Sequence, residues 1–115
     1  MIAGVGTDIV KISRVKSKLS VRILSDEEKV IYESFSSESR KQEYLAGRFA
    51  VKEALTKAFS STKYFFSFTD MVILNDEEGR PHLIKPEIND LKVWLSISHE
   101  REYALAFCLL EDKSK

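Results

Sequence analysis

The segment 38–59 constrains the fold most, because it predicts one helix about as long as a small domain is wide. Its 22 residues contain no proline and are rich in helix formers. At 1.5 Å per residue such a helix is about 33 Å long. Its interior glycine, Gly47, costs about 1 kcal/mol relative to alanine, which favours a close packing contact there. One long helix therefore dominates the expected architecture.

From residue 64 onward the hydrophobic pattern alternates with a period of two, which is typical of half-buried strands. Strands are predicted over 2–8, 71–74, 82–84, 91–98 and 103–110, and shorter helical segments over 10–19, 25–34 and 86–90. Ser25 and Glu28 match a capping box at the start of a helix. Because adjacent hairpins occur without βαβ alternation, we expect an α+β fold, with a largely antiparallel sheet packed with one long helix and shorter helices.

The composition fits a single domain over residues 1–115, with 43% hydrophobic residues. Eighteen basic and eighteen acidic residues give a formal charge of zero. This argues against a protein that binds nucleic acid through a large net positive charge. No stretch approaches the ~20 apolar residues of a membrane helix, and the first residues lack the basic region of a secretory signal. We therefore expect a soluble cytoplasmic protein with no nucleic-acid or membrane partner. The lone Cys108 suits a reducing compartment.

The neutral total conceals two basic blocks. Residues 1–24 contain five Lys or Arg and one acid, Asp8, for a net charge of +4. Residues 45–63 contain four Lys or Arg and one acid, Glu53, for a net charge of +3. A random order can produce such blocks, so charge patterning alone does not identify a partner.

Glu53 is the most informative residue of the long helix. An apolar stripe at helical spacing runs through 45–50, and Glu53 continues it. A carboxylate that faces a core requires a cation, a metal or hydrogen bonds, because burying it alone is very costly. Two interpretations remain open: an ion pair with Lys57 at i,i+4 spacing, worth about 0.2–0.5 kcal/mol, or a metal ligand.

Asp8 stands at the end of the first predicted strand, between Thr7 and an apolar pair. One interpretation is an N-cap for the following helical segment, since Asp is among the best caps. The other is convergence with Glu53, because two carboxylates with water and phosphate oxygens suit Mg²⁺. The two residues are 45 positions apart, so only the fold can bring them together.

His99 follows Ser96–Ser98 at the end of a predicted strand, where a surface histidine and a ligand contact are both open interpretations. His82 has no supporting neighbours and is interpreted as structural. Cys108 is interpreted as a small core residue. There is no zinc pattern, Walker loop, Rossmann fingerprint or nucleophile elbow. From the residues alone, the sequence predicts a small α+β protein with a candidate anion or metal site.

Residues Gly4–Val10, Arg14, Leu45–Phe59 and Ser96–His99 together resemble the holo-acyl-carrier-protein synthases, small 4′-phosphopantetheinyl transferases of bacterial fatty-acid synthesis. The resemblance extends over nearly the whole chain in the family's order, and the helix motif is long and specific. It implies the fold of that family and its reaction. In that reaction the 4′-phosphopantetheine arm of coenzyme A moves to a serine of apo acyl carrier protein, releasing adenosine 3′,5′-bisphosphate.

The same resemblance implies three catalytic residues. Asp8 and Glu53 would be the Mg²⁺ ligands, and Lys57 would hold a phosphate. A metal that bridges the two phosphates neutralises charge and stabilises the leaving oxygen, and Lys57 adds a point charge. Three acceptors of the serine proton remain open: Glu53, a metal-bound water and a carboxylate-oriented water. We favour a water organised by the metal and Glu53.

The resemblance also implies the binding residues. Arg48 would contact the coenzyme A phosphates, and His99 would lie beside the nucleotide portion. Arg14, with Arg22 as a second candidate, would face the acidic recognition helix of the carrier protein. The family typically forms homotrimers with each active site at a subunit interface, which implies the same assembly for this chain.

Two segments depart from the family pattern. Residues 60–62 read Ser-Ser-Thr where the family usually has a Gly-containing loop, which leaves a phosphate-cradling role of this loop open. The segment between Arg14 and Arg22 is shorter than usual, which leaves the carrier-contact surface open. Two other function classes also stay open: a non-catalytic module that binds an acidic protein, and a Mg²⁺-dependent hydrolase of a nucleotide pyrophosphate.

Overall fold

The computed structural model describes residues 1–113, in which the other elements surround one long helix, α3. The helices are α1 (Ser20–Ile23), α2 (Asp26–Ser34) and α3 (Glu38–Phe59), with short 3-10 helices at Ile12–Arg14, Ser17–Leu19 and Phe68–Asp70. The strands are β1 (Ile2–Lys11), β2 (Val72–Asn75), β3 (Pro81–Lys85), β4 (Leu91–His99) and β5 (Tyr103–Asp112). Among these described residues, no helix is both long enough and apolar enough to cross a membrane.

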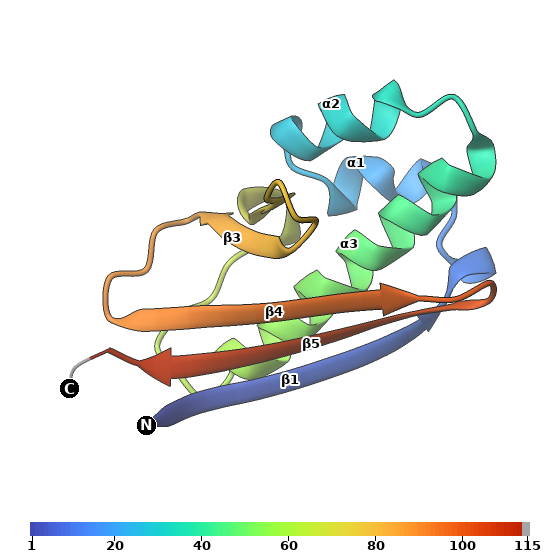
Figure 1. Ribbon diagram of the computed structural model, residues 1–115. Helices are drawn as coiled ribbons and strands as arrows, with labels where there is room; N and C mark the ends of the chain where they lie inside the picture. Colours follow the sequence, from blue (N-terminus) through green and yellow to red (C-terminus); the bar gives the residue numbers. More distant parts are fainter. Residues whose placement is uncertain (114–115) are drawn as a thin grey trace.

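β1, β5 and β4 form a three-stranded antiparallel sheet in that order, and β2 and β3 form a separate antiparallel hairpin. Figure 1 shows α3 lying across one face of the sheet, with α1 and α2 on the side of α3 away from the sheet. The β2–β3 hairpin lies beside β4. The register places Asp8 opposite Ala106 and His99 opposite Ala104. The predicted α+β fold with a largely antiparallel sheet is confirmed.

Two glycines bring β1 unusually close to α3. A Cβ atom on Gly6 would lie 1.9 Å from the carbonyl oxygen of Ala54, and one on Gly4 would lie 2.2 Å from that of Ala58. Only residues without a side chain fit at these separations. The close contact predicted at Gly47 is milder, since a Cβ there would lie 3.4 Å from Ile97. The tightest helix–sheet contact is therefore made by β1.

The core lies between α3 and the sheet, and β5 shows the expected alternation. Its buried side chains are those of Ala104, Ala106, Cys108 and Leu110. The prediction that Cys108 is a core residue is confirmed, and burial raises the pKa of its thiol to about 12. On β4 the even-numbered side chains are exposed, so the half-buried strand predicted over 91–98 is also confirmed.

Two predicted helical segments need correction. The segment 10–19 is helical only in part: 3-10 helices form at Ile12–Arg14 and Ser17–Leu19, whereas Val10 and Lys11 continue β1 in pairing with β5. The buried Ile12 and Val15, three residues apart, gave the helical signal, and a single 3-10 turn satisfies that spacing. The segment 86–90 forms a bend and a turn instead of a helical turn, because these five residues connect β3 directly to β4.

Candidate active site

Asp8 lies within β1 and faces α3. Side chains alternate along a strand, and Asp8 shares the parity of Gly4 and Gly6, whose missing side chains would point into the helix. The ammonium of Lys57 donates to Oδ1 of Asp8 at 3.1 Å and to the carbonyl oxygen of Thr7 at 2.9 Å. The close packing of β1 on α3 therefore brings a carboxylate and an ammonium together.

The N-cap interpretation of Asp8 is wrong. β1 continues past Asp8 to Lys11, and Lys11 precedes the first 3-10 helix without a side-chain cap hydrogen bond. Pairing with β5 holds Asp8 in mid-strand, so its carboxylate lies between strand and helix. The side chain is 18% exposed, which leaves it accessible to a ligand as well as to Lys57.

Glu53 lies one turn before Lys57 on α3, so the two side chains share a face of the helix. The interpretation as a Glu53–Lys57 ion pair is wrong for the part of the chain that the structure describes, because the Lys57 ammonium is directed to β1. Glu53 is also partly exposed, which corrects the expectation that it faces the core. The charged side chains that α3 buries are those of Arg48 and Lys52. Asp8, Glu53 and Lys57 together are called the carboxylate site below.

Asp8 and Glu53 are the residues of this site that could hold a divalent cation. Within residues 1–113, no three His, Cys, Asp or Glu side chains are grouped as a metal site. Mg²⁺ does not require such a group, since it is usually bound through one or two carboxylates together with waters and substrate phosphates. Lys57 occupies one oxygen of Asp8, Oδ1. The donor set therefore fits Mg²⁺ completed by substrate oxygens.

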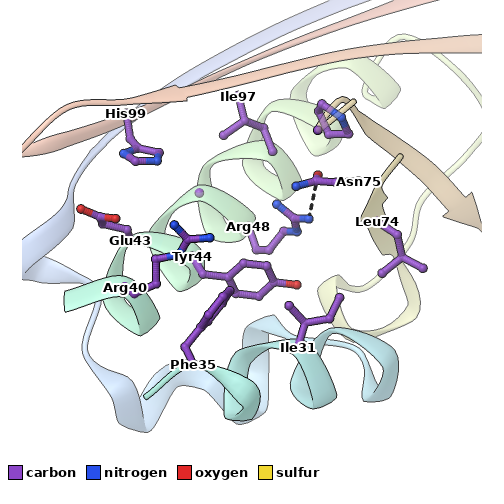
Figure 2. A pocket seen from close by; sticks show the side chains of 13 residues that line it. Ile31, Phe35, Arg40, Glu43, Tyr44, Arg48, Leu74, Asn75, Ile97 and His99 are labelled. Carbon is purple, nitrogen blue, oxygen red and sulfur yellow. Dashed lines mark hydrogen bonds between the residues drawn. The ribbon is translucent and has the colours of Figure 1, made fainter. Parts of the chain in front are cut away.

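A cavity of about 500 Å³ lies between α3, the end of β4 and the β2–β3 hairpin. It is called the arginine cavity below, and its polar lining consists of Arg40, Glu43, Tyr44, Arg48, Asn75 and His99. Figure 2 shows Arg40, Tyr44 and Arg48 along α3, with His99 facing them from β4. Two guanidinium groups and an imidazole outnumber the single carboxylate, that of Glu43, and favour an anionic ligand with planar or phosphate oxygens.

Arg48 is buried, and polar partners fix its guanidinium. Nε donates to the carbonyl oxygen of Ile73 at 3.2 Å, and an Nη2 hydrogen is donated to Oδ1 of Asn75 at 3.2 Å. The guanidinium carbon lies 4.6 Å from the centroid of the Tyr44 ring. A guanidinium has five N–H groups, so donors remain for a ligand. Arg48 and His99, which the resemblance assigns to one ligand, do line one cavity.

The two regions lie on opposite sides of α3. Arg48 and Lys57 are nine residues apart, which is two and a half turns, so their side chains leave the helix in opposite directions. Their Cα atoms are separated by about 13 Å along the helix axis. The structure therefore divides the predicted site residues into two groups: the carboxylate site on one flank of α3, and Arg48 with His99 on the other.

Several residues in and near the arginine cavity were not predicted from the sequence as site residues. Arg40 and Tyr44 precede Arg48 at intervals of four, a spacing that places all three on one helix face and could have identified them. Glu28 and Lys52 form a fully buried ion pair with a separation of 2.6 Å. The sequence did not indicate this ion pair, because the capping box at the start of α2 already accounted for the carboxylate of Glu28.

The remaining predicted positions lie at the surface. Arg14, in the first 3-10 helix, and Arg22, in α1, are both exposed. The hydroxyls of residues 60–62 donate to backbone carbonyl oxygens of α3 and β1. They therefore stabilise the carbonyl end of α3, which is the end of a helix that disfavours anions.

Comparisons with known proteins point to the family that the sequence motifs resemble. A family model described as the 4′-phosphopantetheinyl transferase superfamily matches residues 4–108. The chain is similar to the holo-[acyl-carrier-protein] synthase of Petrotoga mobilis, with 41% identity over 98% of this chain and 99% of the relative. It is also similar to that of Staphylococcus saprophyticus, with 44% identity over 96% of this chain and 99% of the relative.

Solved structures give the same result. The crystal structure of a Bacillus anthracis holo-(acyl-carrier-protein) synthase in complex with CoA (3',5'-ADP) matches with a TM-score of 0.87 and 39% identity, over 98% of this chain and 99% of that one. The Thermotoga maritima holo-[acyl-carrier-protein] synthase matches with a TM-score of 0.84 and 36% identity, over 98% of this chain and 66% of that one.

Proposed function

The chain belongs to the 4′-phosphopantetheinyl transferase superfamily, and from that premise we propose the reaction that its site performs. The family resemblance of the sequence is confirmed. The protein is a transferase that moves the 4′-phosphopantetheine group of coenzyme A to a serine of apo acyl carrier protein. The products are the holo carrier protein and adenosine 3′,5′-bisphosphate. Relatives 41% and 44% identical bear the name of this activity.

The contact between Asp8 and Lys57, on the side of α3 that also bears Glu53, is the observation that carries the proposal. In this transfer a serine hydroxyl approaches a pyrophosphate with several negative charges. Catalysis therefore depends on positioning and on charge neutralisation. The Lys57 ammonium, which contacts Asp8, can attract phosphate directly, while the carboxylates of Asp8 and of Glu53 on the same helix face can attract a metal ion.

We assign Asp8 and Glu53 as ligands of Mg²⁺, which when bound would neutralise pyrophosphate charge and stabilise the leaving oxygen. Lys57 is 54% exposed and has three N–H donors, so it can reach a phosphate oxygen while holding Asp8. The serine Oγ attacks the phosphorus that bears pantetheine, and the bond from that phosphorus to the bridging oxygen breaks. The bisphosphate leaves with the bridging oxygen. We favour a water that Glu53 orients as the acceptor of the serine proton, with Glu53 itself as the alternative.

The arginine cavity is assigned to the adenosine 3′,5′-bisphosphate portion of coenzyme A. Its volume of about 500 Å³ lies within the usual range for small-molecule sites. Arg40 and Arg48 offer bidentate donors to phosphate groups, and His99 lies at the rim on the last residue of β4. The similar synthase of Bacillus anthracis was crystallised in complex with CoA (3',5'-ADP), which supports this assignment.

Completion of the site between copies of the chain, in a homotrimer, is a further part of the proposal. Arg48 and Lys57 point away from opposite sides of α3. A coenzyme A molecule that contacts both the arginine cavity and the carboxylate site of one chain would therefore have to cross the helix. Contact between the Lys57 side of one copy and the Arg48 side of the next is head to tail, and such contacts form a ring when the rotation between copies closes, which a threefold rotation does. Light scattering would give three times the 13.2 kDa chain mass, and a monomer in active preparations would contradict the assembly.

The outer face of the sheet supports this assembly. Its exposed apolar side chains, on the face away from α3, are Val5, Ile9, Trp94, Tyr103, Leu105 and Phe107. Contiguous apolar surface of this kind marks interaction sites in soluble proteins.

The carrier protein is proposed to bind at the exposed Arg14 and Arg22, because an acidic helix complements this basic block. Participation in fatty-acid biosynthesis and a cytoplasmic location complete the proposal. The acyl carrier protein in the names of the relatives supports the role in fatty-acid biosynthesis. The unpaired Cys108 is consistent with a reducing compartment such as the cytoplasm.

Intact-mass spectrometry tests the reaction. Purified chain, Mg²⁺, coenzyme A and apo carrier protein should yield carrier protein heavier by one phosphopantetheine. A chelator should abolish the mass change, and added Mg²⁺ should restore it. Carrier binding without any mass change would indicate a non-catalytic module. Bisphosphate release without carrier protein would indicate a hydrolase.

A further inference from the structure

Glu28 and Lys52 form an ion pair buried between α2, α3 and β2. Oε1 of Glu28 lies 2.6 Å from Nζ of Lys52, and neither side chain is exposed. The ammonium also donates to the carbonyl oxygens of Ile23 at 2.7 Å and Phe68 at 2.8 Å, so its three N–H groups all have acceptors. Burial lowers the pKa of Lys52, and Glu28 counteracts that shift. Apolar residues often replace such a pair without loss of stability, so stability alone does not explain it.

The second oxygen of Glu28 joins the pair to β2. Oε2 accepts a hydrogen bond from the backbone N–H of Ile73 at 2.8 Å. The carbonyl oxygen of Ile73 accepts one from Nε of Arg48 at 3.2 Å, and that Nε lies 3.9 Å from Oε2. Glu28 and Arg48 therefore hold Ile73 through its backbone N–H and its carbonyl, respectively.

The same strand fixes the other end of the guanidinium. Arg48 donates to Oδ1 of Asn75, two residues beyond Ile73 on β2, along the dashed line in Figure 2. Arg48 and Asn75 line the arginine cavity, whereas Glu28 and Lys52 do not. A displacement of β2 would move both acceptors of Arg48 together and would turn its donors relative to the cavity.

We propose that the buried Glu28–Lys52 pair is a positioning element for the arginine cavity. It fixes β2 so that Ile73 and Asn75 hold Arg48 in the orientation that binds an anionic nucleotide. This rests on the proposed function, because adenosine 3′,5′-bisphosphate is the ligand assigned to the cavity. Glu28 and Lys52 act through Arg48 and do not touch that ligand.

The test uses the double variant Glu28→Gln/Lys52→Met, which removes both charges and largely keeps the side-chain volumes. Each single variant would leave an unpaired buried charge. After circular dichroism has shown that the double variant is folded, calorimetry measures its dissociation constant for adenosine 3′,5′-bisphosphate. Hydrogen exchange measures the protection of the β2 amides. We expect the dissociation constant to rise about tenfold and β2 exchange to accelerate about tenfold, with the KM for carrier protein unchanged.

One further variant serves as a second test and two as controls. Asn75→Ala removes the exposed anchor of Arg48 and leaves the buried pair intact, so it should weaken bisphosphate binding even if the double variant does not fold. Glu78→Ala, an exposed carboxylate on the same hairpin, should bind like the unaltered chain. Leu110→Ala lowers stability from a fully buried position on β5 and should also bind normally.

Unchanged affinity and unchanged β2 exchange in a folded double variant would overturn the proposal, as would unchanged affinity in Asn75→Ala. An affinity loss in Leu110→Ala as large as in the double variant would reduce the effect to general destabilisation and would also overturn it. If the unaltered chain does not bind the bisphosphate, the proposed function fails. The exchange rates then decide by themselves whether the pair fixes β2.

Discussion

Lys57 illustrates how tertiary contacts override local preference at a single residue. In an isolated helix, Glu53 four residues earlier would attract it by about 0.2–0.5 kcal/mol. In the folded chain the ammonium instead donates to the carbonyl oxygen of Thr7 and to Asp8. Two charge-assisted hydrogen bonds outweigh one helix-surface pair. Glu53 is thereby left available for another cation.

The carboxylate site leads to the first prediction. Asp8→Ala and Glu53→Ala should each lower the transfer rate by a factor on the order of 100 or more, because each removes a proposed metal ligand and Glu53 is also proposed to guide the serine proton. The melting temperature should change by only a few degrees, since both side chains are partly exposed. The mass assay and thermal unfolding measure these effects. Glu33→Ala, on the exposed side of α2, is the matched control. A fully active variant would reject the role of that carboxylate.

Tyr44 gives a prediction about stability. Its hydroxyl is buried and makes no hydrogen bond of standard geometry among residues 1–113, although the Arg48 guanidinium lies beside the ring. An unsatisfied buried hydroxyl is unfavourable by about 1–3 kcal/mol. Tyr44→Phe should therefore keep or raise the free energy of unfolding, by up to about 1 kcal/mol, in chemical denaturation. A loss of stability would show that the hydroxyl has a favourable partner.

At the scale of elements, the contact between β1 and α3 sets the geometry of the carboxylate site. Gly6→Ala would place a Cβ atom 1.9 Å from the Ala54 carbonyl oxygen, so strand and helix must separate. We expect a loss of about 1–3 kcal/mol in the free energy of unfolding, as for other overpacked cores. The transfer rate should also fall, because Asp8 moves away from Lys57. Thr7→Ala, the exposed neighbour, should change neither quantity, and a normal rate in Gly6→Ala would contradict the coupling.

The basic block of the first 3-10 helix and α1 gives a prediction about partner recognition. Arg14→Glu should raise the KM for carrier protein by about tenfold and leave the KM for coenzyme A unchanged, because it reverses a charge that is proposed to face an acidic surface. Steady-state kinetics with each substrate varied in turn would measure both constants. Lys85→Glu, on β3, is a control of the same charge change. Equal effects of Arg14→Glu on both substrates would contradict the placement.

Elements with strong local signals were predictable from the sequence. The bounds of α3 agree with the predicted segment 38–59, since helix formers and an N-terminal serine cap mark it. The capping box at Ser25 also agrees. The helical turns within 10–19 were predictable, but the strand conformation of Val10 and Lys11 was not, because it depends on pairing with β5 and such pairing leaves no local signature.

The candidate site was predictable only in part, for a similar reason. The resemblance supplied Asp8, Glu53 and Lys57, but the contact between Lys57 and β1 depends on the approach of two segments 49 residues apart. Arg40 and Tyr44 could have been found from their spacing on α3. The buried partner of Lys52 could not, since any of the carboxylates in the chain would have matched equally well.

At the scale of the whole molecule, α3 has a different chemistry on each flank. The flank toward β1 carries the carboxylate site, and the flank toward the β2–β3 hairpin carries the arginine cavity. The apolar outer face of the sheet provides surface for contact between copies. The molecule thus presents in different directions the two residue groups that we propose are halves of one site.

Because the halves point in different directions, two defective chains should be able to rescue each other. An Asp8→Ala chain retains an intact arginine cavity, and an Arg48→Gln chain retains an intact carboxylate site. Equal mixing, with unfolding and reassembly, should restore about a quarter of the normal sites if each site joins neighbouring copies of a ring. Activity of the mixture no higher than that of the separate variants would place both halves of each site within one chain. If the mixture is active, genes for the two variants expressed in the same cell should also complement each other, as a consequence of the opposed flanks of α3.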